Sequence, residues 1–316
     1  MRKWITFLMT ALVGTSISYA NANFGQVNFE AGYRSDNITF NHEFRDEDVG
    51  LKSKFEDLDI FQLGLQARTT LGCNFYLRGS AYFGWILDGD FKEVARTNSF
   101  YGASNYGGGC GFTSNNRNTI DDRYVYGIAA AIGYPFYFCD CSMALAPVIG
   151  YSYDQQNIRL DGSVTTLYRS DYGIGACRDD CCCTHKFTNR WYGPFVGVDF
   201  LYRPYGGCWD LYADLEYHWG NNSARRGLSD YNDGDHRNLT SHNARAWVFA
   251  AGADYAFDDC WTAGVSVKFQ DWRAHKNRHY RYNDEYAGSS SGEDTRIKHS
   301  SKWRSYAVNF TVGRDF

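Results

Sequence analysis

The feature that most constrains the fold of this chain is a two-residue alternation of apolar and polar side chains. Residues 209–219 carry tryptophan, leucine, alanine and tyrosine on one face and mostly aspartate, glutamate and histidine on the other. A period of two indicates a β-strand. Because a soluble core would have to cover both faces, the segment fits a strand that crosses a bilayer, with aromatic side chains at both interfaces. The alternation recurs at residues 75–87 and 261–270.

The composition agrees with membrane-crossing strands. Aromatic residues make up 18% of the chain, and it holds 32 glycines but only 4 prolines, which suits strands, tight turns and aromatic belts. No apolar run is long enough for a transmembrane helix. A mean hydropathy of −0.50 is compatible with a barrel, because only alternate positions must be apolar. The alternative, a soluble β-sandwich with one wet face, would need tight turns at both ends of its strands.

The lengths of the connections also favour a barrel. Short turns are expected at residues 72–74, 139–141, 204–208 and 258–260, and long polar stretches at roughly 35–55, 88–121, 161–186, 221–242 and 283–298. Short periplasmic turns and long extracellular loops are typical of outer-membrane barrels. We therefore predict an all-β, antiparallel up-and-down transmembrane β-barrel of about ten strands, with both termini on the periplasmic side.

The two ends of the chain carry targeting signals. Arg2 and Lys3, a short apolar stretch and the small-x-small site at residues 20–22 predict a signal peptide at residues 1–22, which leaves a single barrel domain at residues 23–316. Removing two basic residues gives 30 − 36 = −6, from 32 Lys and Arg and 36 Asp and Glu, so no basic domain argues for nucleic acid. The aromatic C-terminus, Phe316, resembles the assembly signal of bacterial outer-membrane barrels and implies the barrel-assembly machinery as a partner.

Strand alternation also predicts which side chains line the lumen. Their mixed charge leaves two outcomes open: opposite charges pair and plug the barrel, or they line a constricted wet path. The predicted lumen-lining residues are Gln62, Gln66, Arg68, Arg78, Asp199, Arg203, Asp210, Asp214, Glu216, His218, Lys268 and Gln270.

The ten cysteines fall outside the membrane band. In an oxidising compartment they are disulfide candidates, and an odd number on each side leaves at least one per side without an internal partner. The run at residues 181–183 has poor geometry for a tetrahedral metal site, and we predict neither metal nor cofactor. The turns hold Cys73, Cys139, Cys141, Cys208 and Cys260, and the extracellular loops hold Cys110, Cys177, Cys181, Cys182 and Cys183.

The signal peptide, the length, the tyrosine-rich alternating strands and the turn cysteines together resemble the Protochlamydia outer membrane protein family of chlamydia-like bacteria. The resemblance covers the whole mature chain and rests on layout rather than on one motif. It implies porin-like diffusion of small solutes, together with a structural role in which disulfides link the barrel to other envelope proteins.

A second resemblance is to omptins, ten-stranded outer-membrane endopeptidases with an Asp pair and an Asp-His pair at the outer rim. Asp88 and Asp90 look like the omptin Asp-x-Asp, while Asp235 and His236 lie in the loop after Trp219, where omptins carry Asp-x-His. Here aspartate and histidine are adjacent, and adjacent strand residues point to opposite faces. We therefore favour no catalytic residue, with an endopeptidase or a surface adhesin as the alternative function.

A basic segment extends past the strand at residues 261–270. Two interpretations are open: contact with lipopolysaccharide phosphates, or a solvated extension of the strand. The segment contains Arg273, His275, Lys276, Arg278, His279 and Arg281.

Overall fold

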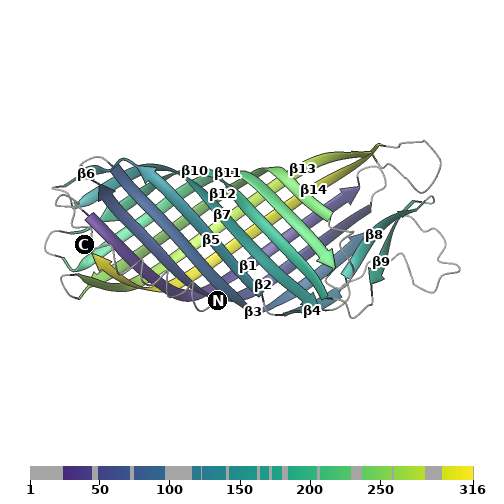
Figure 1. Cartoon of the computed structure of the whole chain (residues 1–316), viewed down its shortest axis with the longest axis horizontal. Helices are drawn as coiled ribbons and strands as arrows, with labels where there is room; N and C mark the ends of the chain where they lie inside the picture. The colour runs from purple at the N-terminus through teal and green to yellow at the C-terminus, as the bar shows by residue number, and fades with distance from the viewer. Residues whose placement is uncertain are drawn as a thin grey trace, which may run out of the picture.

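The fold is a closed antiparallel β-barrel (Figure 1). The computed structural model describes residues 24–44, 49–71, 75–96, 116–121, 123–139, 142–161, 164–170, 173–179, 184–204, 207–228, 237–257, 260–281 and 294–315. Within these ranges no helix is long and apolar enough to cross a bilayer. The predicted signal peptide and Phe316 lie outside the described residues.

Ten strands form the wall within the described ranges. The fourth is interrupted: β4, β5 and β6 follow one another along β7, and β3 pairs with the first two of them. A separate hairpin, β8–β9, lies between β7 and β10 in the chain. The elements are β1 (Phe24–Phe44), β2 (Val49–Leu71), β3 (Phe75–Arg96), β4 (Asn116–Asp121), β5 (Arg123–Gly133), β6 (Phe136–Phe138), β7 (Met143–Asp161), β8 (Val164–Ser170), β9 (Gly173–Asp179), β10 (Thr184–Tyr202), β11 (Trp209–Leu228), β12 (Arg237–Ala256), β13 (Trp261–Arg281) and β14 (Asp294–Asp315).

The first and last strands close the wall. β1 pairs with β14 from Gln26↔Asp315 to Phe44↔Ile297, so neither strand leaves an open edge. Closure is required in hydrocarbon, where each unpaired backbone group costs several kcal/mol. The predicted fold class is confirmed.

The strands are longer than predicted. Apart from the interrupted fourth strand, they run from 19 residues in β7 and β10 to 23 in β2, whereas crossing hydrocarbon takes about 9–11 residues. The loop predicted at residues 35–55 is therefore mostly wrong: only residues 45–48 separate β1 from β2. The stretches at 88–121, 221–242 and 283–298 are shortened in the same way, because the strands continue beyond the bilayer. The stretch at 161–186 keeps nearly its predicted bounds and contains the β8–β9 hairpin.

The polarity of the two faces inverts along the strands. Near the start of β1, Phe29 and Tyr33 are half exposed on the outside while Asn28 is buried inside. Farther along the same strand, Ile38 and Phe40 are buried inside and polar side chains alternate with them on the outside. The half that carries the short turns is therefore built for lipid, with a polar interior. The projecting half resembles a soluble barrel whose interior is rich in apolar and aromatic side chains.

Candidate functional site

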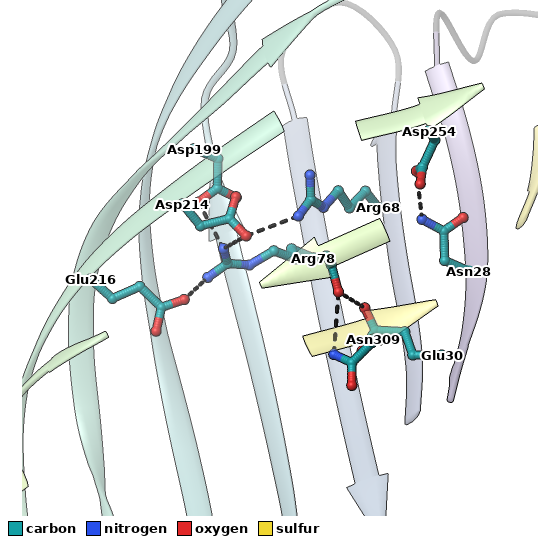
Figure 2. Close-up of polar contacts among 10 residues, drawn as sticks. Asn28, Glu30, Arg68, Arg78, Asp199, Asp214, Glu216, Asp254 and Asn309 are labelled. Carbon is teal, nitrogen blue, oxygen red and sulfur yellow. Dashed lines mark hydrogen bonds and ion pairs between the residues drawn. The ribbon is translucent and has the colours of Figure 1, made fainter. Parts of the chain in front are cut away.

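The barrel interior holds a buried charge cluster on the short-turn side of the barrel (Figure 2). Arg78 on β3 reaches across to β10 and β11, with its Nη1 2.8 Å from Asp199 Oδ1 and 3.1 Å from Asp214 Oδ2, and it also pairs with Glu216. Arg68 on β2 places its Nη2 2.9 Å from Asp214 Oδ2. Two arginines from one wall therefore neutralise carboxylates of the opposite wall.

The strand register explains why these charges meet. Arg68 and Arg78 are directly opposite each other on the β2–β3 ladder, and Asp199 and Asp214 are directly opposite on the β10–β11 ladder. Like charges at such positions repel. The repulsion within each like-charged pair is offset because the two arginines face the two aspartates across the lumen. The low dielectric of the interior strengthens the attraction between these opposite charges.

A hydrogen-bonded chain of serine, histidine and glutamate lies beside the cluster. His218 Nδ1 is 3.0 Å from Ser152 Oγ, and its Nε2 is 2.6 Å from Glu216 Oε2. The imidazole also packs against the rings of Phe195 and Trp272, with ring centroids 4.7 and 5.0 Å away. All three members of the chain are buried, so this arrangement fixes side chains rather than offering a nucleophile to a substrate. Sequence alternation predicted His218 in the lumen but missed Ser152.

A second polar group ties the walls near the short-turn end. Asp254 on β12 accepts hydrogen bonds from Asn28 Nδ2 at 3.1 Å, Gln26 Nε2 at 3.3 Å and Thr311 Oγ1 at 2.6 Å. The donors come from β1 and β14, and Figure 2 shows Asn28 beside Asp254. The polar interior is therefore bonded across the barrel at more than one level.

Beside the charge cluster lies a cavity of about 60 Å³, roughly enough for a few water molecules. Its lining includes Glu30, Gln62, Tyr82, Glu216 and Lys268. A volume of this size can hold a small hydrated pocket but is far below the usual size of a ligand site.

Aromatic side chains fill the interior above the cavity. Trp191, Trp272 and Trp303 are fully buried, with ring centroids 5.6 to 6.3 Å apart. Farther out, Phe40 on β1 stacks with Phe187 on β10 at 6.0 Å. Because Trp191 and Phe187 on β10 meet rings from β13, β14 and β1, which are not neighbours of β10, the aromatic side chains meet across the axis and plug the barrel.

Most predicted lumen-lining residues occupy inward positions. The buried ones are Gln62, Arg68, Arg78, Asp199, Asp214, Glu216, His218 and Gln270, while Gln66, Asp210 and Lys268 are half-buried.

Arg203 was predicted to line the lumen, but its side chain is exposed at the rim. It lies just beyond the end of β10, and its exposed guanidinium pairs with Asp210 and, at 2.7 Å, with Asp315. Partial burial lowers the pKa of Arg203, but these two carboxylates outweigh that effect and raise it. The period-two rule failed here because the strand ends at Tyr202.

The candidate catalytic residues do not come together among the described residues. A bulge after Ile86 shifts the register of β3, so Asp88 and Asp90 point outward while Gly89 faces the interior. Asp235 and His236 lie outside the described residues. Two outward carboxylates cannot share a water molecule with a base in the lumen.

The described turn cysteines lie at one rim. Cys139, Cys208 and Cys260 are exposed free thiols, and the last two directly precede the exposed Trp209 and Trp261. Interfacial tryptophans mark the edge of the hydrocarbon. The two thiols therefore lie about 3 Å along the strand beyond that edge.

The other cysteines are not described at the level of side chains. Cys177 lies in β9, and Cys73, Cys110, Cys141, Cys181, Cys182 and Cys183 lie outside the described residues. Among the described side chains, no three potential metal ligands are grouped to hold an ion.

One solved structure agrees with this geometry. The barrel is similar to the outer membrane protease OmpT from Escherichia coli, with a TM-score of 0.58 and 13% identity over 92% of this chain and 97% of that chain. A match to the outer membrane protein OprG from Pseudomonas aeruginosa has a TM-score of 0.38 and 9% identity over 94% and 97%. No curated protein sequence matches the chain.

The family model described as Protochlamydia outer membrane protein matches residues 28–316. That range includes nearly every described strand residue. The chain is therefore an outer-membrane β-barrel that belongs to the Protochlamydia outer membrane protein family.

Proposed function

We propose that this protein is a structural component of the outer membrane, linked to other envelope proteins or to further copies of itself by disulfides at its periplasmic rim. The observation that carries the proposal is the combination of a plugged interior with exposed thiols at one end of the barrel. A barrel whose interior is filled is better suited to contacts at its outer surface and rims than to passage of solutes through its lumen.

The periplasmic thiols are placed for intermolecular bonding. Cys208 and Cys260 are held beside interfacial tryptophans, so every copy would present them at about the same depth below the membrane. The predicted turns carry an odd number of cysteines, which leaves at least one without a partner in the same rim. In the oxidising space beneath the outer membrane, such a thiol forms disulfides readily.

Gel analysis of native envelopes tests this role. Without reductant the protein should migrate in high-mass complexes, and reductant should release a monomer that is still folded and heat-modifiable. Cys177→Ser is the matched control, because it removes an extracellular cysteine and should leave the complexes intact. Native envelopes that give only monomer without reductant would refute the cross-linking role. The full test variant carries serine at Cys73, Cys139, Cys141, Cys208 and Cys260.

Porin-like passage of small solutes is the second candidate. The cavity beside Lys268 and Glu30 favours it, because it is an internal space lined largely by polar side chains. The aromatic plug opposes it, since a solute would have to displace tryptophan rings packed across the barrel. Refolded protein in a planar bilayer should therefore give no steady conductance, and stable ion-sized currents from the wild-type chain would reverse this ranking.

A further inference from the structure

A row of basic side chains crosses the outer surface on three neighbouring strands. Arg245 on β12 is directly opposite Arg273 on β13, and Arg273 is directly opposite Lys302 on β14. Arg304 lies one outward-facing position nearer the membrane on β14. We call these four residues the basic row.

The basic row borders the aromatic belt. Arg245 is two residues outside Trp247, which is 55% exposed, and Arg304 is two residues outside Tyr306, which is 53% exposed. Between them, the ring of Phe269 packs on Tyr306 with centroids 5.0 Å apart. Two residues along a strand span about 7 Å, so the cations lie at the depth of lipid headgroups, directly above aromatic anchors.

The row carries more positive charge than its own strands neutralise. Among the described side chains, Asp271 is the carboxylate that pairs with it, at 2.7 Å from Arg273 Nη2 and 3.7 Å from Arg304 Nε. Like charges directly opposite on a sheet destabilise it. Partial burial and the charges of Arg304 and Arg273 lower the pKa of Lys302, although Asp271 opposes them. An external anion would relieve this repulsion.

We propose that the outer face of β12–β14 binds the phosphate of a lipopolysaccharide molecule in the outer leaflet through the basic row. Arginine forks donate paired hydrogen bonds to phosphate oxygens. The acyl chains of the same molecule would lie along the apolar surface below Trp247 and Tyr306. The site binds lipid from the side and does not use the barrel interior.

A second copy of the chain is the other anionic partner to consider. The acidic surface at the same level, on β2 and β3, is already partly neutralised. Glu56 pairs with Lys54 and Lys92, and Asp59 accepts a hydrogen bond from Tyr33. A phosphorylated lipid brings a concentrated charge that this acidic surface does not, so the lipid is the better match.

Binding can be measured on the purified full-length barrel in neutral detergent. Lipopolysaccharide, its dephosphorylated form and inorganic phosphate are titrated separately, with binding followed by native mass spectrometry and thermal shift. The test variant is Arg245→Gln/Arg273→Gln/Lys302→Gln. The matched control is Lys54→Gln/Lys92→Gln, which removes two outward-facing lysines on β2 and β3 that already pair with Glu56.

Wild type and the control variant should bind lipopolysaccharide equally, and the test variant about 100-fold more weakly, since each basic residue near an anionic surface contributes roughly fivefold. The dephosphorylated lipid should bind wild type as weakly as lipopolysaccharide binds the test variant, and millimolar phosphate should compete only weakly. Equal affinity of wild type and the test variant would overturn the proposal. So would tight binding of the dephosphorylated lipid, or a dimer that the test variant abolishes while lipid binding is unchanged. If the triple variant does not fold, Arg273→Gln alone should still weaken binding severalfold.

Discussion

Removing Arg78 should destabilise the barrel far more than removing an arginine at the rim. Arg78 has a side chain that is 7% exposed and touches three carboxylates. Arg203 is 44% exposed and touches two carboxylates. We expect Arg78→Met to lower the free energy of unfolding by about 3–4 kcal/mol, because it leaves a buried charge without its partner. Arg203→Met should lower it by about 0–1 kcal/mol.

The contacts set the size of the effect. Without Arg78, Asp214 keeps Arg68 at 2.9 Å, and Glu216 keeps His218 at 2.6 Å. Asp199 loses its one described ion pair. We therefore expect the unpaired, buried carboxylate of Asp199 to account for most of the lost stability. Removing that charge as well, in Arg78→Met/Asp199→Asn, should recover at least about 1.5 kcal/mol relative to Arg78→Met.

Urea unfolding of the refolded barrel in lipid vesicles, followed by tryptophan fluorescence, measures these differences. The midpoint and slope of each variant must be fitted together, since a changed slope signals a different unfolded or folded state. Equal, small losses for Arg78→Met and Arg203→Met would refute the reasoning, because burial would then make no difference. A double variant less stable than Arg78→Met would equally contradict it.

Three further outcomes follow from packing and charge. Trp272→Ala should lower the free energy of unfolding by about 3–5 kcal/mol, measured by the same urea titration. Gly193→Ala should cost about 1–3 kcal/mol, because its new Cβ would lie 2.4 Å from a carbonyl oxygen of β11, whereas Gly79→Ala meets nothing within 4 Å and should be neutral by the same measure. The hydrogen bond from Lys92 lowers the pKa of Glu56. The ionised Glu56 side chain therefore stabilises the barrel above the ordinary glutamate pKa of about 4.3, and this stabilisation is lost as the pH falls through the lowered pKa of Glu56. Glu56→Gln should shift the urea midpoint at pH 7 but not at pH 2.

The membrane-embedded half of the barrel, which carries the short turns, was predictable because side chains that face lipid must be apolar. Side chains such as Asp214 and Glu216 could be assigned to the interior from alternation alone, since their neighbours had to face acyl chains. Which carboxylate meets Arg78 could not be predicted. That contact joins residues more than a hundred positions apart and depends on the register with which the closed wall brings β3 opposite β10.

The projecting half was missed for a different reason. Beyond Tyr33 the outward positions of β1 become polar, and the segment then looks like a loop if only lipid-facing positions are scored. The alternation is still present in this segment, but the apolar residues now occupy the inward positions: Ile38 and Phe40 alternate with the outward Asn37 and Thr39. A strand that leaves the membrane keeps its period of two but shifts its apolar positions by one residue.

This inversion of polarity fixes how far the barrel stands above the cell surface. On β14 the strand continues from Arg304 at the lipid boundary to Asp294. At a usual strand rise and tilt, those ten residues lift the tip roughly 25 Å. Sliding the barrel inward would press charged rows into hydrocarbon, and sliding it outward would wet the lipid-facing aromatics. The outer ends of the strands therefore stand at a set height, and an antibody that binds them would do so well clear of the lipid headgroups.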